Sequence, residues 1–363
     1  MTIVLNGTTG ITTPTTSTTG EFVTSVTGFK NRIINGAMVI DQRNAGASVT
    51  PTASAYTLDR WQATIAASSK ISVQQSSTAP AGFKNSLLVT SLAATTVGTT
   101  DYYLIQQKIE GFNIADLGWG AAGASTVTLS FWVRSSLTGT FGGSLGNNSF
   151  DRTYPFTYTI SAANTFEYKT ITIAGDTSGT WLSINGVGIQ LTIGLGSGAT
   201  YSGTAGAWAA TGYQTATGAT QVVATNGATF YITGVQLEKG STATSFDYRP
   251  YGTELALCQR YYQRLKPSAT NSLLAGGLQQ STTTAGLTVP VPVSLRTTPT
   301  STQSGLIITD NASFGQSISS IDSIFNSGST VGLVVSNSAG GTQFRACFLR
   351  GDAGNYIDFS AEL

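Results

Sequence analysis

Apolar and polar residues alternate along many short segments of this chain, and this period of two constrains the fold more than any other feature. In residues 125–134 every second residue is apolar, with Leu129 and Phe131 on one face and Trp132 on the other. Side chains of a β-strand point alternately to its two faces, so this pattern predicts a strand with one buried face. Residues 188–195 alternate in the same way, and further strand candidates are residues 70–74, 87–90, 102–109 and 170–173.

Turn-forming residues separate these segments, and only one convincing helix interrupts them. Strands at this spacing without intervening helices predict antiparallel sheets packed face to face. We therefore expect an all-β chain, with an antiparallel jelly-roll or β-sandwich followed by a short helix and a second, smaller β-sandwich domain. The expected parts are an N-terminal segment at 1–30, the jelly roll at 31–252, a linking helix at 253–266 and a C-terminal β domain at 267–363.

The predicted helix carries a single apolar stripe. Leu255, Cys258, Tyr262 and Leu265 fall at positions i, i+3, i+7 and i+10 of a segment that begins at Thr253. This is the a/d spacing of a short helical seam, along which three copies of the chain could meet. Packing of the helix on its own sandwich explains the stripe equally well.

Two strand segments contain residues that predict an irregular ladder. In residues 229–238 the alternation changes phase at Gly234, which predicts an inserted bulge residue and a bent strand at a sheet edge or corner. Residues 287–296 contain Pro290 and Pro292, which lack the N–H that a ladder needs, so this strand is expected at an edge. Further strands of the C-terminal domain are expected at 305–309, 330–336, 342–349 and 355–359.

The composition excludes several classes of function. The chain has no histidine, which removes the usual general base and the commonest metal ligand, so we expect no metal site, no cofactor and no enzyme. Lys and Arg number 18 against 17 Asp and Glu, which leaves no positive excess for a nucleic acid or a membrane surface. No run approaches the roughly 18 apolar residues of a membrane span, and the first residues lack a signal peptide's pattern. We expect synthesis in a cytoplasm and no membrane insertion.

Cysteines and carboxylates offer little chemistry. Cys258 and Cys347 are far apart in the sequence and are expected to be free, buried thiols. Without histidine, a hydrolase would need a pair of carboxylates. The candidates are Asp59, Asp101, Glu110, Asp116, Asp151, Glu167 and Asp176. Each stands among turn residues or strand ends, where a carboxylate usually caps a turn or meets an arginine. Residues 176–179 carry a weak calcium-loop signal, for which a plain turn is the favoured explanation.

Aromatic residues in loops are the best candidates for ligand contacts. Sugar rings present apolar C–H faces that stack on Trp and Tyr. The candidate glycan contacts are Trp208, Tyr213, Trp181 and Trp119. Packing within loops or between subunits is the alternative role for them. Trp61 and Trp132 lie in strand-like segments, so packing is expected for both.

Several motifs resemble one known family. Residues 31–38 (NRIINGAM), 56–61 (YTLDRW) and 107–111 (QKIEG) occur in order, and three later segments continue the match. These are residues 128–136, 232–240 and 246–262, the last with DYRPY at 247–251 and CQRYY at 258–262. Together they resemble phage tail-fibre and receptor-binding proteins over roughly residues 31 to 262. Residues 6–12 and 289–299 are also similar to that family, more weakly.

The resemblance implies a jelly roll similar to carbohydrate-binding domains, carried by proteins that form homotrimers. It also implies an N-terminal segment that attaches to other phage tail or virion proteins, and it supplies no catalytic motif. The first hypothesis is thus a tail-fibre or receptor-binding component of a virion that attaches to host surface glycans. An architectural virion protein, such as a head fibre, decoration or tail-tip scaffold, is the alternative. A polysaccharide depolymerase is the third hypothesis.

Overall fold

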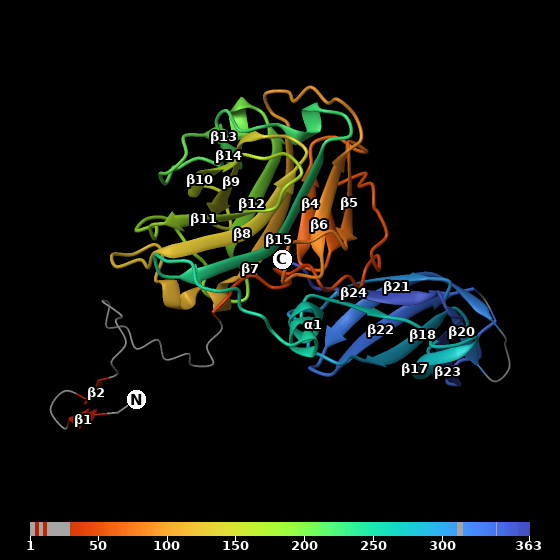
Figure 1. Ribbon diagram of the computed structural model, residues 1–363. Coiled ribbons are helices and arrows are strands. Elements are labelled where there is room, and N and C mark those ends of the chain that lie inside the picture. The colour runs from red at the N-terminus through yellow and green to blue at the C-terminus, as the bar shows by residue number, and fades with distance from the viewer. Residues whose placement is uncertain (1–3, 7–9, 13–29, 311–314, 339) are drawn as a thin grey trace.

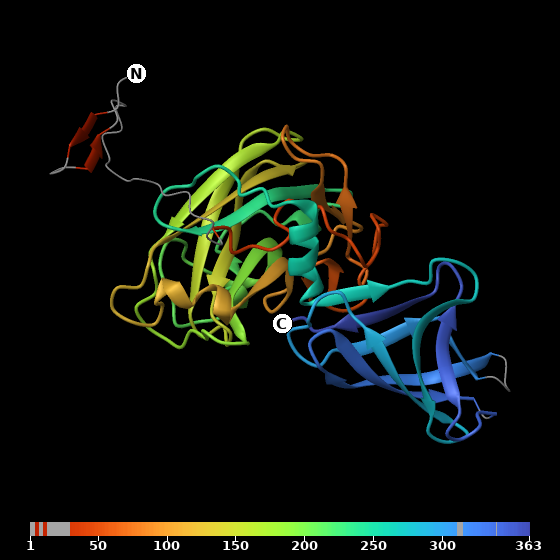
Figure 2. The same cartoon turned by 90° about the horizontal axis from the view of Figure 1, so that it is seen from below.

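A computed structural model describes residues 4–6, 10–12, 30–310, 315–338 and 340–363. Its regular structure is almost entirely β, as predicted, and forms two bodies with one α-helix and the C-terminal end of the chain between them (Figures 1 and 2). The predicted N-terminal attachment segment lies outside the described residues, except for Lys30 and two short strands. These are β1 (Val4–Asn6) and β2 (Gly10–Thr12), which pair with each other.

The first body is a sandwich of two antiparallel sheets. One sheet has six strands in the order β10-β9-β12-β7-β4-β3, and the other has five in the order β11-β8-β15-β6-β5. The strands of the six-stranded sheet are β3 (Ala55–Leu58), β4 (Trp61–Ile65), β7 (Tyr102–Glu110), β9 (Gly139–Gly146), β10 (Thr153–Ile160) and β12 (Val187–Ser197). Those of the five-stranded sheet are β5 (Ile71–Ser76), β6 (Ser86–Ser91), β8 (Val127–Ser135), β11 (Glu167–Ile173) and β15 (Thr229–Lys239).

The core of the sandwich lies between the two sheets and follows the predicted alternation. Leu129, Phe131 and Ile193 are fully buried there, and Trp61 joins them at the start of β4. Short connections surround the sheets: the 3-10 turns η1 (Gly111–Asn113), η2 (Ala115–Leu117), η3 (Ala199–Tyr201) and η4 (Val222–Ala224), and the parallel pair β13 (Ser202–Gly203) and β14 (Thr215–Ala216).

The predicted bulge at Gly234 is present, but its strand is not at an edge. The pairing of β15 with β8 shifts register between Thr233 and Gln236. Before the bulge, β15 lies between β8 and β6, so it is central in the sheet. After the bulge, residues 31–36 pair with it, and the N–H of Arg32 donates to the carbonyl of Leu237. The phase change therefore marks where β15 exchanges one neighbour for another.

The predicted helix is shorter than expected. Helix α1 covers Tyr251–Gln259, and β16 (Tyr262–Leu265) follows after two residues. Leu255, Cys258, Tyr262 and Leu265 therefore do not form one helical stripe, and the seam predicted from their spacing is wrong. Cys258 packs with Ile34, Ile40 and Tyr261 beneath the sandwich, with Leu255 against them, whereas Leu265 packs on the core of the second body. The chain changes from helix to strand because β16 gains a ladder with the last strand of the protein.

The second body combines a closed barrel with a small sheet. Six strands close in the order β17-β18-β22-β21-β20-β23, so they form a barrel where a second sandwich was expected. They are β17 (Ser272–Gln279), β18 (Thr284–Pro290), β20 (Ile307–Asp310), β21 (Gln316–Asn326), β22 (Thr330–Asn337) and β23 (Ala346–Gly351). The flanking sheet has the order β16-β24-β19, with β19 (Thr300–Ser304) and β24 (Tyr356–Ser360). Leu287, Val289 and Leu333 lie in the barrel core.

The prolines of the predicted edge strand have another explanation. Strand β18 pairs with β22 over residues 284–290 but with β17 only over residues 285–288, so its side toward β17 is free at Pro290. Pro290 is the last residue of β18 and Pro292 lies beyond it. Their missing N–H groups therefore fall at and past the end of the strand, where the ladder does not need them.

A buried polar network joins the two bodies. Arg60 forms an ion pair with Glu362, and its guanidinium lies 3.6 Å from the centre of the Tyr261 ring. Arg260 donates to both carboxylate oxygens of Glu110, at 2.9 and 2.7 Å, and the Tyr261 hydroxyl donates to the same carboxylate at 2.6 Å. Burial tends to raise the pKa of Glu110, but these hydrogen bonds outweigh it, so the net pKa is lowered.

Candidate functional site

Three of the four predicted glycan contacts meet in one cluster. The ring centres of Trp119 and Trp181 are 4.7 Å apart, and that of Trp208 lies 5.4 Å from Trp119 and 5.5 Å from Trp181. Tyr154 of β10 adds a fourth ring, 5.3 Å from Trp208. The loops after η2, β11 and β13 thus bring together side chains that are far apart in the sequence.

The geometry of this tryptophan cluster is that of packing. Each pair of indoles is close to perpendicular, so the edge of one ring covers the face of another. The three indole N–H groups donate to backbone carbonyls, Trp119 to Ser125 at 2.7 Å, Trp181 to Ser178 at 3.1 Å and Trp208 to Ala174 at 2.8 Å. Trp119 is only 7% exposed and belongs to the sandwich core. The cluster fits the alternative role of loop packing.

Tyr213 lies apart from the tryptophan cluster. Its backbone N–H donates to the Thr153 hydroxyl at 3.2 Å. Its ring rests on Gly203 of β13, where any Cβ would collide with it. The ring contact closes the loop of residues 203–214 on itself, and the hydrogen bond to Thr153 joins the loop to β10.

A different set of aromatic side chains lines an open groove on the outer face of the five-stranded sheet. The groove has a volume of about 550 Å³. Its floor is Ser130 and Trp132 of β8 and Gly234 of β15. The described residues that line it are Phe83, Ser130, Trp132, Tyr168, Gly234, Ala243, Thr244, Ser245, Phe246 and Tyr248. Among these residues there are aromatic rings, hydroxyls and backbone groups, and no charged side chain.

Strand alternation places the first pair of rings. Phe131 and Val133 point into the core and are fully buried, so Trp132 between them points outward. Tyr168 of β11 stands directly opposite Trp132 in the ladder, and the two ring centres are 5.4 Å apart. Tyr168 is 43% exposed. The pair therefore offers aromatic surface to a ligand in the groove.

The opposite wall is a second group of three rings. Phe83 lies 5.1 Å from Phe246 and 5.4 Å from Tyr248 between ring centres, and the last two are 4.8 Å apart. The Tyr248 hydroxyl donates to the carbonyl of Gly82 at 2.7 Å, which ties the segment after β15 to the loop before β6. Tyr248 is 58% exposed.

Gly234 makes this wall possible. Its φ is +62°, in the left-handed region, and a Cβ there would lie 2.6 Å from the Phe83 ring. Only glycine accepts both conditions without strain. The bulge that the sequence predicted thus allows Phe83 to lie directly on the sheet beside Trp132.

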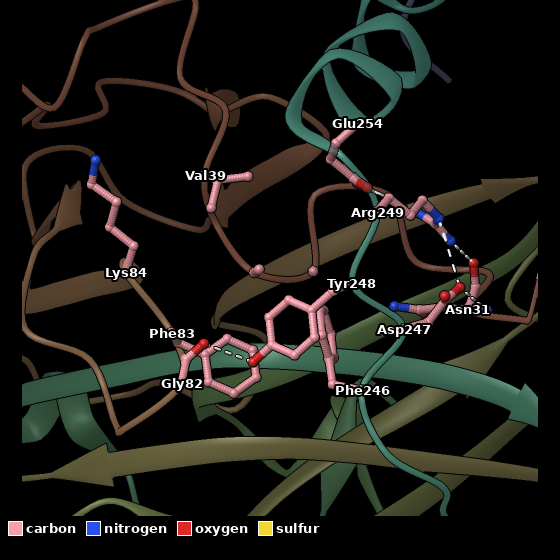
Figure 3. Close-up of a pocket in the computed structure, with 12 residues that line it drawn as sticks. Asn31, Val39, Gly82, Phe83, Lys84, Phe246, Asp247, Tyr248, Arg249 and Glu254 are labelled. Carbon is pink, nitrogen blue, oxygen red and sulfur yellow. Dashed lines mark hydrogen bonds and ion pairs between the residues drawn. The ribbon is translucent and has the colours of Figure 1, made fainter.

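A smaller cavity of about 230 Å³ lies behind the same wall (Figure 3). Its polar lining is already engaged within the chain. Arg249 contacts Glu254 at 3.2 Å and donates to the carbonyl of Ile33 at 3.2 Å, and the N–H of Asn31 donates to Asp247 at 3.3 Å. Lys84 extends away from this group. The polarity of the cavity serves the fold, and the open groove is the better candidate site.

The alternation in the sequence indicates the exposed position of Trp132, although its place within a strand favours packing. Trp132 is on the polar face of the alternating segment 125–134, with Thr128, Ser130 and Arg134. A tryptophan on that face is exposed unless another layer covers it. Tyr168, Phe83 and Tyr248 had no comparable signal, because their proximity depends on strand order and on the segment after β15.

The candidate carboxylates are engaged in structural roles, as expected. Asp176 accepts two hydrogen bonds from Arg152, at 2.7 and 2.6 Å, which accounts for the weak calcium-loop signal. The others bind arginine, lysine, amide or turn partners: Asp59 with Gln42, Asp101 with Gly98, Glu110 with Arg260, Asp116 with Arg32, Asp151 with Asn147 and Glu167 with Lys169. Cys258 and Cys347 are free and buried, as predicted. Burial raises the pKa of both thiols, that of Cys347 to about 11.

Within the described residues, no group of three or more Cys, Asp and Glu side chains could hold a metal ion. In the same residues, no helix has the length and apolar character needed to cross a membrane.

No family model and no curated protein matches the chain. Several solved structures are similar in part. A tailspike protein 4 enzymatically active domain of bacteriophage CBA120 is 10% identical with a TM-score of 0.30, over 58% of this chain and 21% of that one. A putative sugar binding protein from Bacteroides thetaiotaomicron is 12% identical with a TM-score of 0.35, over 58% and 100%. A family 11 carbohydrate-binding module from Clostridium thermocellum, in complex with a mixed-linked tetrasaccharide, is 11% identical with a TM-score of 0.29, over 51% and 91%.

Proposed function

We propose that this chain is a tail-fibre or receptor-binding component of a phage virion that attaches to host surface glycans through the aromatic groove. The observation that carries the proposal is the pairing of Trp132 with the exposed Tyr168 beside a second aromatic wall, in a groove open to solvent. The apolar C–H faces of sugar rings stack on such rings, and flanking hydroxyls bind sugar hydroxyls. The exposed Ser245 supplies such a hydroxyl, and the Thr244 hydroxyl, which donates to Glu238 at 2.7 Å, can still accept a hydrogen bond.

The groove is the proposed site in place of the tryptophan cluster because its rings leave aromatic surface uncovered. In the cluster, ring edges and internal hydrogen bonds already use the faces and the N–H groups. The positions of the seven candidate carboxylates give no support to glycan hydrolysis, because each is bound by a neighbour within the chain.

We also propose that the protein works as a homotrimer on the virion, attached through its N-terminal segment. The residues of the predicted helical seam do not support subunit contacts, since Cys258 and Tyr262 are covered by the chain itself. Exposed apolar side chains on the barrel support contacts between subunits instead, among them Leu278, Ile324 and Phe344. Mass photometry of the full chain tests this, and a uniform monomer at all concentrations would refute it.

A glycan array followed by titration calorimetry tests the binding function. Trp132→Ala removes the floor of the groove, so affinity should fall about tenfold or more, because exposed aromatic anchors dominate such sites. Trp208→Ala is the matched control, since it removes an indole from the tryptophan cluster and should leave affinity unchanged. The reverse pattern would move the site to the cluster. No binding to any glycan on the array, together with no effect of the protein on phage adsorption, would favour the architectural role.

A further inference from the structure

Among the residues that the structure describes, one guanidinium beside the groove has no acidic partner. Arg134 follows Trp132 by two residues in β8, so both side chains lie on the outer face of the five-stranded sheet. Arg134 stands opposite Tyr231 of β15, and its guanidinium carbon is 4.9 Å from the centre of that ring. It is 5.9 Å from the ring of Phe166, which precedes β11. The cation therefore rests on two aromatic rings next to the Trp132–Tyr168 pair.

Other arginines on the sandwich are paired, and this difference points to a ligand. Arg32, Arg60 and Arg152 each bind a carboxylate of the chain. Arg134 has no ion pair with any residue that the structure describes. Its Nε lacks a hydrogen-bond partner, as do those of Arg32 and Arg60, so the missing carboxylate is what sets Arg134 apart. A partly buried charge without a counter-ion lowers stability.

The nearby acid on β11 is committed elsewhere. Glu167 lies opposite Val133 in the ladder and alternates with the outward Tyr168. Its carboxylate contacts Lys169 at 2.6 Å and accepts from the N–H groups of Ser161 and Ala162, both at 2.8 Å. The groove lining itself includes no Asp or Glu among the described residues. An anionic ligand in the groove would thus meet one unpaired cation and no lining carboxylate to repel it.

We infer that Arg134 selects acidic glycans by binding the carboxylate of a uronic or sialic acid residue that extends from the groove. This inference rests on the proposed function, because it names the sugar class that the same site takes. A guanidinium stacked on aromatic faces keeps its N–H edges free, and two parallel N–H groups match the two oxygens of a carboxylate. Trp132 and Tyr168 bind the sugar ring, and Arg134 binds its charge.

The test uses an array that presents each acidic glycan beside its carboxyl-reduced, neutral form, with the full-length protein. The wild type should bind the acidic form at least tenfold more tightly, and this preference should weaken at high salt because ion pairs are screened. Arg134→Met keeps the packed aliphatic part of the side chain without the charge. It should therefore lose the preference for the acidic glycan but still bind the neutral form. Arg134→Lys keeps the charge but lacks the two parallel N–H groups of a guanidinium, so it should retain only part of the preference for the acidic glycan.

Each remaining outcome has a separate meaning. Equal binding of acidic and neutral forms by the wild type, or an unchanged preference in Arg134→Met, would overturn the role of Arg134 and leave the proposed function standing. Equal binding of sulfated and carboxylated glycans would overturn the assignment to carboxylates. Failure of the wild type to bind any glycan would overturn the proposed function itself. Trp132→Ala should lose binding of both the acidic and the neutral glycan, which separates ring stacking from charge recognition.

Discussion

The sandwich and the barrel are built from the same kinds of residue, yet they bury their strands in different ways. The sandwich leaves the outer face of its five-stranded sheet partly open, and the aromatic groove lies there. The barrel strands close in one ring, in which each strand pairs with two neighbours. All five tryptophans of the chain lie in the sandwich. The difference teaches that an open sheet face can serve recognition, whereas closure serves stability.

The junction connects the two bodies through hydrogen bonds between them. Strand β24 ends beside the sandwich, where the Tyr56 hydroxyl donates to the carbonyl of Leu363 at 3.0 Å and Lys108 donates to the same oxygen at 2.8 Å. Arg296, from the loop after the barrel strand β18, donates to the carbonyls of Ala361 and Asn185, both at 3.0 Å. Each body thus depends on side chains of the other for its buried polar groups.

The largest effect is expected from removing the guanidinium at the centre of this junction. Arg60→Met leaves the buried Glu362 carboxylate with Arg43 as its remaining ion-pair partner, which should cost up to about 3–5 kcal/mol. Tryptophan fluorescence reports the sandwich and labelling of Cys347 reports the barrel during urea unfolding. We expect coincident transitions in the wild type and separate ones in the variant.

The control for the junction is Lys239→Met, which breaks an exposed pair with Asp116. It should change stability by about 1 kcal/mol or less. Coincident, unshifted transitions in Arg60→Met would show that the two bodies are not coupled through this ion pair.

A matched pair of leucines compares the two cores directly. Leu129 in β8 and Leu333 in β22 are both fully buried. Truncation to alanine should cost about 2–5 kcal/mol in either place, with the higher cost in the barrel, because closed walls collapse around a cavity less readily than two sheets. Chemical unfolding of both variants measures this, and a higher cost for Leu129→Ala would reverse the interpretation of closure.

The junction should also respond to pH through Asp59. Burial raises the pKa of this carboxyl from 3.8 to about 6, although its oxygens accept from the Gln42 N–H groups at 2.6 and 2.7 Å. The folded state therefore holds a proton that the unfolded state has lost between about pH 4 and 6. Stability from this group is complete below that window and is lost as the pH rises through it, by on the order of 3 kcal/mol.

Asp59→Asn should remove this component of the pH dependence, whatever its effect on absolute stability. The measurement is the slope of the unfolding free energy between about pH 4 and pH 7 in the two proteins, a range that spans the ordinary and the raised pKa of Asp59. Glu110 acts in the opposite sense, because its lowered pKa makes its stabilisation disappear as the pH falls. Parallel slopes in wild type and variant would contradict the raised pKa of Asp59.

The smallest effect compares two glycines with nearly the same backbone conformation. Gly234 in the groove has φ +62° and Gly328 in the barrel has φ +67°, but a Cβ at Gly328 would meet nothing within 4 Å. Gly328→Ala should cost about 1 kcal/mol from backbone strain alone. Gly234→Ala adds the collision with Phe83 and should cost up to about 3 kcal/mol and weaken glycan binding. Equal costs for the two variants would mean that the Phe83 ring moves away from the new Cβ without loss of stability.

Some of the site could be predicted from the sequence and some could not. The period of two in residues 125–134 placed Trp132 on the outer face, and the phase change at Gly234 marked the bulge. Of the four loop aromatics predicted as glycan contacts, three pack against one another. The Phe83 wall depends on contacts between the loop before β6 and the segment after β15, which no local pattern encodes.

The sequence by itself determined the all-β class, the faces of the main strands, the free thiols and the structural use of the carboxylates, because each follows from local periodicity or residue chemistry. Tertiary structure alone decided that α1 stops at Gln259, that β18 lies inside a closed barrel and that five aromatic rings meet over one sheet. These outcomes depend on which distant strands pair. Strand pairing is chosen by the total burial and hydrogen bonding of the folded chain, which a short segment does not contain.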